Sequence, residues 1–271
     1  MARLLIAGYG FLGQALDKVF SEAGWEVRKL SRSGRDACIQ CDISSPEDVA
    51  GLTGEYDLVI HCAASGGGGE ESYRSVYFEG CLNLLGRFAE ARFIFTSSTS
   101  VYAQNDHSVV TEDSPAEPDT ATARILRESE KRVLSAGGIV ARLSGLYGPG
   151  RCHVLKNLLN GTARLDGAGE RIMNFIHRDD VARAMLLLGS LEPAPVGEVY
   201  NVTAEPVSQY DCYAALAESF SCAMPGPSAA DLPRRRGNTS KRVSNQKLRG
   251  LGWRPRYAEF VEMAKACALP S

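Results

Sequence analysis

The chain has 271 residues, 44% of them hydrophobic, which suits one large domain with or without a smaller one beside it. A formal net charge of −2 leaves no strong field for nucleic acid or an anionic membrane, so neither is expected as a partner. No apolar run approaches the roughly 20 residues that cross a bilayer, and no secretory signal follows Met1, so we expect a soluble cytoplasmic protein.

Short apolar strands alternate with helical patterns through the first half of the chain. This alternation predicts βαβ units and a parallel sheet. Strands are expected at residues 3–7, 25–30, 38–41, 57–62, 93–96 and 139–143, and helices at 11–21, 73–91 and 121–135. The strands are short and almost continuously apolar, which is typical of parallel strands covered on both faces.

The pattern changes after Gly150. A helix is expected at 154–160, then a polar glycine-rich segment, a helix at 179–188 and a strand at 199–202, whereas residues 229–271 show little strand character. We predict a doubly wound parallel Rossmann sheet from residues 1–150 plus about 176–203. A smaller, mostly helical C-terminal substrate lobe would comprise 151–175 plus 204–271.

Residues 8–13 fit the pattern G-x-G-x-x-G directly after the first strand and at the start of the first helix. Gly8 allows a tight turn, Gly10 lets the backbone approach a pyrophosphate, and Gly13 lets helix and strand pack closely. The N–H groups of Phe11 and Leu12 would face the anion. The pattern predicts a dinucleotide site; a plain strand-to-helix turn is the alternative.

Cofactor choice depends on the end of the second strand, where an acid favours NAD and an arginine favours NADP. Ser31 and Arg32 stand there, and no acid does. A guanidinium can pair with a phosphate through two hydrogen bonds, so we predict NADP, with NAD possible. Asp42 is expected either near the adenine or as the cap of a helix that begins near Pro46.

Several segments in a fixed order resemble the extended short-chain dehydrogenase/reductase superfamily, and within it the NAD(P)-dependent epimerase/dehydratases. The segments are His61–Ala64, Thr96–Tyr102, Leu146–Arg151, Asn174–Ala182, Gly197–Val202 and Leu248–Pro255. The resemblance implies that Ala63 and Ala64 line the nicotinamide-ribose side of the cofactor. It also implies that Ser98 is the catalytic hydroxyl, with Thr99 as a substitute. Local hydrogen bonding in a turn is the alternative for these hydroxyls.

The family's catalytic Tyr-x-x-x-Lys is missing, because its positions fall on Thr122 and Leu126. In the family the tyrosine transfers a proton, and the lysine lowers its pKa and holds the ribose. Arg124 and Arg127 are nearby but stay protonated, so either could replace only the ribose contact. The candidate replacements for the acid are Tyr102, Tyr147 and His153, whereas Tyr73 and Tyr77 are expected to pack.

The predicted substrate residues are Arg151, Arg171, Asn174 and His177. Met173 stands where nucleotide-sugar epimerases carry an arginine for the diphosphate, and Arg171 is the nearest substitute. Asp180 is expected to cap or start a helix. The substrate is expected to be a small molecule, with a nucleotide-linked sugar among the candidates.

Two further patterns are weaker. Cys38 and Cys41 fit C-x-x-C, but without a second pair we expect free thiols and no metal. Arg234–Arg236 is expected to be a solvated loop or a phosphate contact.

Three functions follow in order of preference. The first is an NAD(P)-dependent epimerase/dehydratase-like oxidoreductase, and the second is a non-catalytic NADP(H)-binding sensor. The third, nucleic-acid binding, would rest on Arg234–Arg236 alone. A homodimer through the helices at 73–91 and 121–135 is possible.

Overall fold

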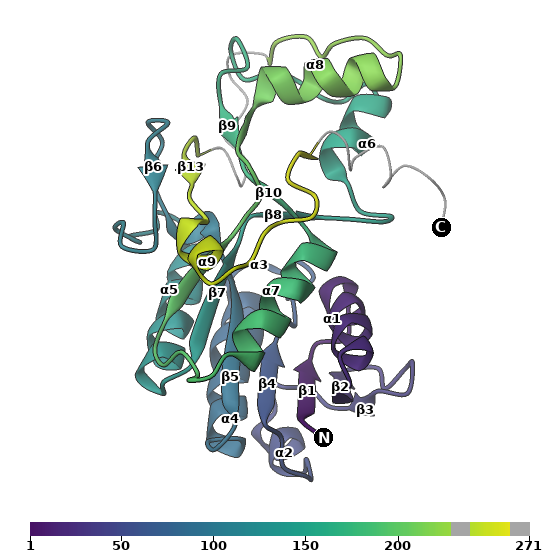
Figure 1. Ribbon diagram of the computed structural model, residues 1–271. Helices are drawn as coiled ribbons and strands as arrows, with labels where there is room; N and C mark the ends of the chain where they lie inside the picture. The colour runs from purple at the N-terminus through teal and green to yellow at the C-terminus, as the bar shows by residue number, and fades with distance from the viewer. Residues whose placement is uncertain (229–238, 261–271) are drawn as a thin grey trace.

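A parallel sheet forms the centre of the protein. The computed structural model describes residues 1–228 and 239–260 (Figure 1); Arg234–Arg236 and the last residues of the chain lie outside the described residues. Seven strands run in the order β11-β7-β5-β4-β1-β2-β3, and every neighbouring pair is parallel. They are β1 (Arg3–Ala7), β2 (Glu26–Ser31), β3 (Ile39–Gln40), β4 (Leu58–His61), β5 (Arg92–Ser98), β7 (Ile139–Leu143) and β11 (Val199–Val202). The predicted doubly wound α/β fold is confirmed.

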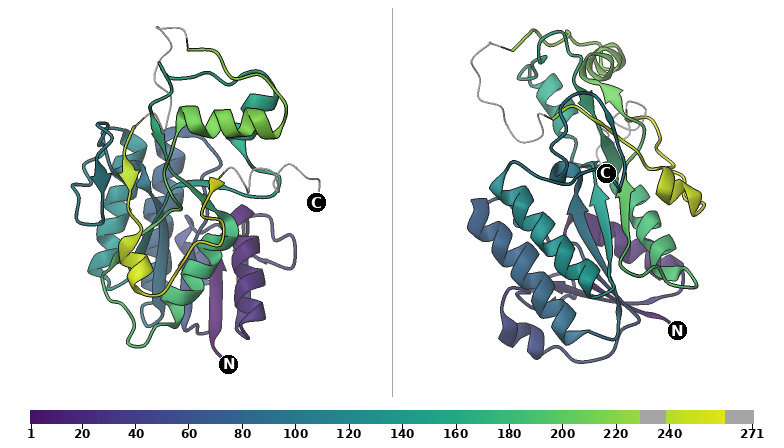
Figure 2. Two further views of the ribbon diagram at one scale, coloured as in Figure 1. Left: turned by 45° about the horizontal axis from the view of Figure 1, so that its top comes forward. Right: turned by 90° about the vertical axis from the view of Figure 1, so that its left-hand side faces the viewer.

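Helices cover both faces of the sheet (Figure 2). Helices α1 (Phe11–Glu22) and α7 (Arg178–Ser190) lie on one face, and α2 (Pro46–Ala50), α4 (Gly80–Arg87) and α5 (Ala121–Ser135) lie on the other. Alternate strand residues enter different cores: Leu4 and Ile6 pack under α1 and α7, and Leu5 packs under α2 and α4. This two-sided burial explains why the strands are continuously apolar.

The helix predicted at 73–91 is shifted and contains a wide turn. It begins with α3 (Gly69–Tyr73), continues through a π-helical segment, η1 (Arg74–Glu79), and ends with α4 at Arg87. Glu70 and Glu71 occupy its first turn, where the helix dipole favours acids. The ring of His61 is buried, and its Nε2 lies 3.0 Å from the carbonyl oxygen of Val76, which belongs to the π-helical segment.

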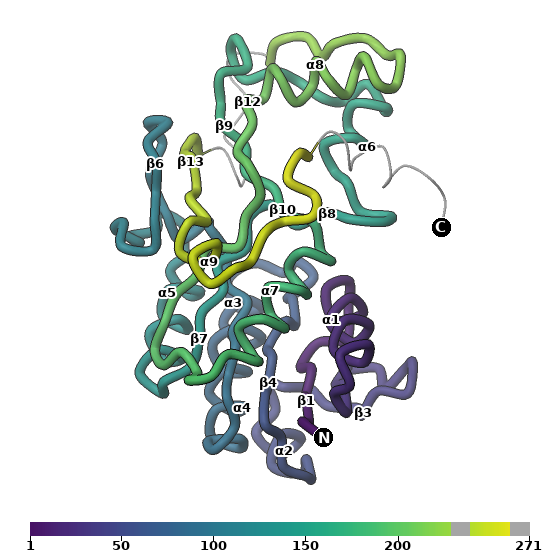
Figure 3. The backbone as a smooth tube through the Cα atoms, in the orientation of Figure 1, coloured from purple at the N-terminus to yellow at the C-terminus, as the bar shows by residue number. Residues whose placement is uncertain are grey.

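A smaller set of elements lies above the carboxyl ends of the strands (Figures 1 and 3). It contains α6 (His153–Leu159), α8 (Gln209–Ser219) and the paired strands β9 (Ile172–Met173) and β12 (Val207–Ser208). Strands β8 (Gly145–Tyr147) and β10 (Phe175–His177) connect it to the sheet. A third apolar cluster draws on three separate stretches of chain, including Leu155, Leu216 and Phe260.

The chain returns to the sheet near its end. Strand β13 (Arg242–Val243) pairs with β6 (Val109–Val110), and α9 (Gln246–Gly250) follows. Leu248 and Trp253 pack in the cluster under α1 and α7, whereas Phe260 belongs to the third cluster. We propose the division into a nucleotide-binding domain and a substrate lobe on this basis, with Leu248 and Trp253 packing on the nucleotide-binding side. No described helix is long and apolar enough to cross a membrane.

Candidate functional site

The glycine loop connects β1 to α1 at the carboxyl edge of the sheet. Gly8 has φ +113°, and a Cβ there would lie 2.4 Å from the backbone of Ala63. A Cβ on Gly13 would lie 2.4 Å from the carbonyl oxygen of Gly8, whereas one on Gly10 would meet nothing within 4 Å. Gly8 and Gly13 are therefore needed for packing. Gly10 borders open space, as a loop that accepts a pyrophosphate requires.

The amino end of α1 suits an anion. Its N-cap, Gly10, offers no side chain, and the first turn contains no acidic residue. The first N–H groups of a helix have no partner within it, and the helix dipole adds positive potential there. Phe11 and Leu12 supply such groups. The residues present therefore fit a dinucleotide.

The loop after β4 lies against the glycine loop at the point where the strand order reverses, between β1 and β4. Ala63 contacts Gly8, and the Cys62 thiol donates a hydrogen bond to the carbonyl oxygen of Gly8 at 3.2 Å. Ala64, next along the chain, is exposed.

Ser31 and Arg32 end β2. The Ser31 hydroxyl accepts a hydrogen bond from the N–H of Gly34, whereas Arg32 is exposed and makes no hydrogen bond or ion pair with a described residue. Asp42 accepts hydrogen bonds from the N–H and hydroxyl of Ser44, which lower the pKa of its carboxyl. Ser45, not Asp42, caps α2. The capping alternative for Asp42 is therefore wrong, because the chain turns again before the helix begins.

Ser98 is the last residue of β5 and lies half-buried at the same edge of the sheet. Its hydroxyl accepts a hydrogen bond of 3.1 Å from the N–H of Ser100 and so caps a short 3-10 turn, η2 (Thr99–Val101). The turn predicted as the alternative reading is present. Among residues 1–228 and 239–260 the Ser98 hydroxyl donates to no acceptor, so its proton is available for a ligand. Thr99 follows it and is also half-buried.

Helix α5 carries the two positions where the family has tyrosine and lysine. Thr122 lies half-buried in the first turn, and Leu126 is 4% exposed in the apolar cluster that also holds Val101. Of the two arginines nearby, Arg124 is exposed and donates to the carbonyl oxygen of Asp119, whereas Arg127 forms an ion pair with Glu130.

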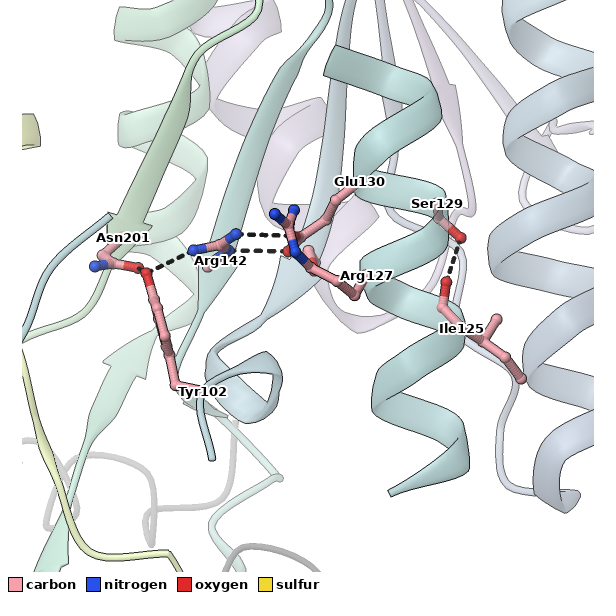
Figure 4. Close-up of polar contacts among 8 residues, drawn as sticks. Tyr102, Ile125, Arg127, Ser129, Glu130, Arg142 and Asn201 are labelled. Carbon is pink, nitrogen blue, oxygen red and sulfur yellow. Dashed lines mark hydrogen bonds and ion pairs between the residues drawn. The ribbon is translucent and has the colours of Figure 1, made fainter. Parts of the chain in front are cut away.

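A buried polar network crosses from α5 to the sheet (Figure 4). Glu130 is fully buried and accepts two hydrogen bonds from Arg142, one from Arg127 and one of 2.6 Å from the hydroxyl of Ser97. Arg142 also donates to the hydroxyl of Tyr102, at 2.7 Å. An arginine inside the apolar strand 139–143 was the sequence signal for this network.

The hydroxyl of Tyr102 is held by hydrogen bonds within this network. Its hydroxyl accepts from Arg142 and donates to Asn201, at 2.9 Å, and burial raises its pKa. His153 is exposed at the start of α6, and Tyr147 is buried with its ring 5.3 Å from that of His177. Tyr73 and Tyr77 pack together, with ring centroids 4.8 Å apart.

The predicted substrate residues contact different partners. The guanidinium of Arg151 lies 5.1 Å from the ring centroid of Phe11, at the glycine loop. Arg171 forms an ion pair of 3.3 Å with Asp166. Asn174 is bonded through both ends of its amide, to the carbonyl oxygen of Lys241 and the N–H of Val243.

His177 caps α7, since its Nδ1 accepts from the N–H of Asp179. Burial lowers its pKa, and its Nε2 has no hydrogen-bond partner among the described residues. Asp180 lies in the first turn of α7, so the prediction that it stands at the start of a helix is confirmed, whereas the alternative that it caps the helix is wrong. Its carboxylate accepts from the N–H groups of Arg256 and Tyr257 and so ties this segment to α7.

The cysteines within the described residues are free thiols. Burial raises the pKa of Cys41 to about 11, which makes it a poor nucleophile. No cluster of His, Cys, Asp and Glu among residues 1–228 and 239–260 could hold a metal ion.

Comparisons with known proteins agree with this geometry. The model of the NAD dependent epimerase/dehydratase family matches residues 4–203. Protein YeeZ of Escherichia coli (strain K12) is 34% identical over 222 residues, which cover 75% of this chain and 78% of that protein. The 2-alkyl-3-oxoalkanoate reductase of Stenotrophomonas maltophilia (strain K279a) is 29% identical over 236 residues, which cover 75% and 70% of the two chains.

Among solved structures, a protein from Methylobacillus flagellatus described as an NAD-dependent epimerase/dehydratase superposes with a TM-score of 0.81. It is 26% identical, and the match covers 98% of this chain and 97% of that one. The glycine loop at the strand-order reversal, the hydroxyl at the end of β5 and these matches lead to one assignment: the chain belongs to the NAD-dependent epimerase/dehydratase family.

Proposed function

We propose that the protein is an oxidoreductase that uses NADP(H) and acts on a hydroxyl or carbonyl carbon of a small molecule. The observation that carries this proposal is the placement of an open glycine loop and the Ser98 hydroxyl at one edge of the sheet. Ligands of open α/β sheets bind at this edge, next to the reversal of strand order.

In this proposal the chain would bind the cofactor, orient the substrate and polarise the substrate oxygen. The glycine loop and α1 hold the pyrophosphate, and the bound nicotinamide supplies hydride chemistry. The Ser98 hydroxyl would donate a hydrogen bond to the substrate oxygen. The N–H of Ser100 already donates to the Ser98 oxygen, and this bond leaves the hydroxyl proton available. Leu126 offers no charge to the ribose, and Thr122 is too weak an acid to replace tyrosine.

Arg32 favours NADP over NAD within this proposal. It is an exposed cation at the end of β2 with no competing hydrogen bond from a described residue. The Oδ1 of Asp42 accepts both hydrogen bonds from Ser44, and Asp42 lies close enough to Arg32 for the arginine charge to contribute to lowering its pKa. We expect NADPH to bind more tightly than NADH. The Arg32→Ala substitution should reduce the difference between the two dissociation constants.

The substrate remains a sugar-nucleotide or a related hydroxyl or carbonyl compound. Met173, 7% exposed, stands where nucleotide-sugar enzymes of the family carry an arginine, and this favours the second class. A homodimer would use the helices over residues 73–91 and 121–135, and Leu82 on the first of them is 40% exposed.

The test is NADPH oxidation across a panel of carbonyl compounds and nucleotide-sugars. Ser98→Ala should lower kcat by roughly 100-fold, as loss of a donor to a reacting oxygen does, without changing NADPH affinity. Ser100→Ala is the matched control, since that exposed side chain makes no hydrogen bond with a described residue. Equal effects of the two variants would contradict the role of Ser98.

Thr122 and Leu126 favour a second candidate, a non-catalytic NADP(H) sensor. Tight NADPH binding with no turnover of any panel member would support it, and gain of activity in Thr122→Tyr with Leu126→Lys would strengthen it. Wild-type turnover would end it. Absence of binding to either nicotinamide dinucleotide would remove both candidates.

A further inference from the structure

Two arginines from distant parts of the chain lie on one aromatic ring. The guanidinium carbon of Arg151 is 5.1 Å from the ring centroid of Phe11, and that of Arg178 is 4.8 Å from it. Phe11 is the first residue of α1 and belongs to the glycine loop. The turn after β8 and the start of α7 therefore both bring a cation to the proposed pyrophosphate site.

The three side chains are held by close packing. A Cβ on Gly148 would lie 3.1 Å from Cζ of Phe11 and 3.1 Å from Cγ of Arg178. The turn that carries Arg151 is closed by two backbone hydrogen bonds between Gly148 and Arg151, of 3.0 and 2.9 Å. The ring is thus a shared contact for both guanidinium groups.

The charges at this point are not balanced within the described residues. Arg151 is exposed and makes no hydrogen bond or ion pair with another described side chain. Arg178 has one ion pair, in which its Nε lies 3.4 Å from a carboxylate oxygen of Asp179. The positive end of α1 adds to the field. Two guanidinium groups beside a helix amino end match a dianionic pyrophosphate, since each can form paired hydrogen bonds to phosphate oxygens.

We propose that Arg151 and Arg178 bind the cofactor pyrophosphate together with the glycine loop, with Phe11 as the ring that both contact. This proposal rests on the proposed function, and it transfers Arg151 from the substrate residues to the cofactor residues. A diphosphate of a nucleotide-sugar would offer the same chemistry. The location on Phe11, inside the glycine loop, favours the cofactor.

The test compares ligands with and without a pyrophosphate. Calorimetry measures the affinity of wild type, Arg151→Gln, Arg178→Gln and the double variant for NADPH and for 2′-AMP, which lacks a pyrophosphate. Each single substitution should weaken NADPH binding about tenfold and leave 2′-AMP binding unchanged. The double variant should also show a shallower salt dependence of NADPH binding.

Arg132→Gln is the matched control, because Arg132 is an exposed arginine in the last turn of α5. Thermal unfolding verifies that each variant folds. Unchanged NADPH affinity in the double variant would overturn the inference while leaving the proposed function intact. So would equal losses for NADPH and 2′-AMP, or a loss confined to UDP-glucose. No NADPH binding by wild type would instead defeat the proposed function.

Discussion

Gly8 and Gly10 are two residues apart in the glycine loop but have different surroundings. Gly8 combines φ +113° with a 2.4 Å approach to the backbone of Ala63, whereas Gly10 faces open space. The pattern G-x-G-x-x-G identifies both glycines but does not distinguish the one that the fold needs from the one that the ligand needs. Their substitution by alanine separates the two roles.

Gly8→Ala should destabilise the protein by about 3 kcal/mol or more, because it adds a clash to a left-handed backbone. Gly10→Ala should change the free energy of unfolding by less than about 1 kcal/mol, yet weaken NADPH binding by about tenfold. Urea unfolding and calorimetry measure the two quantities. A Gly10→Ala protein that binds NADPH normally would contradict the placement of the pyrophosphate.

At the scale of elements, helix α5 has the predicted bounds, residues 121–135, and so do β1, β7 and β11. These elements follow from local periodicity, which a sequence displays directly. The π-helical segment Arg74–Glu79 was not predictable in the same way, since its Val76 carbonyl is paired with His61, which lies 15 residues away on β4. The position of Arg151 on Phe11 likewise depends on a tertiary contact. The sequence therefore predicted the glycine loop and Ala63 beside it, but not the contact between Arg151 and Phe11.

Two glutamates on α5 provide a comparison of buried and exposed charge. Glu130→Gln keeps the size of a fully buried side chain but leaves Arg142 without a counter-charge, so we expect a loss of about 3–5 kcal/mol. Glu128→Gln breaks an ion pair with Arg74 whose side chains are 42% and 43% exposed, and should cost less than about 1 kcal/mol. Chemical denaturation gives both values. Similar losses would show that the network of Figure 4 is not the main stabiliser of this helix.

At the scale of the whole molecule, the segment around Lys241 joins regions far apart in sequence. Its Nζ donates to the carbonyl oxygen of Tyr102 and to the hydroxyl of Thr239, both at 2.7 Å, and its carbonyl oxygen accepts from Asn174. Lys241 is 3% exposed, and burial lowers its pKa to about 8. Lys241 thus links the loop that follows Ser98 to the upper elements. Because the lysine is buried, its charged form carries a desolvation penalty in the folded protein.

This cost predicts a pH dependence of stability. Between pH 8 and about 10.4, the ordinary lysine pKa, the folded protein has lost the Lys241 proton while the unfolded chain retains it. The free energy of unfolding of wild type should therefore rise with pH across this window relative to Lys241→Met, and the difference should be constant below pH 8. Denaturation at several pH values measures it, with Lys247→Met as the control for loss of an exposed ammonium. A difference that stays flat, or that falls as pH rises, would refute the prediction.

The third apolar cluster takes residues from three separate stretches: 147–175, 207–222 and Phe260. Between them the chain passes back through α7 and β11, and later through α9. Several stretches of chain connect the upper elements to the sheet. A hinge rotation of the upper elements as a rigid body would have to change the backbone of all these connections at once, so the arrangement opposes such a motion. For engineering, the consequence is that substrate preference cannot be exchanged between relatives by one crossover in the gene; a functional chimera must replace all three stretches together.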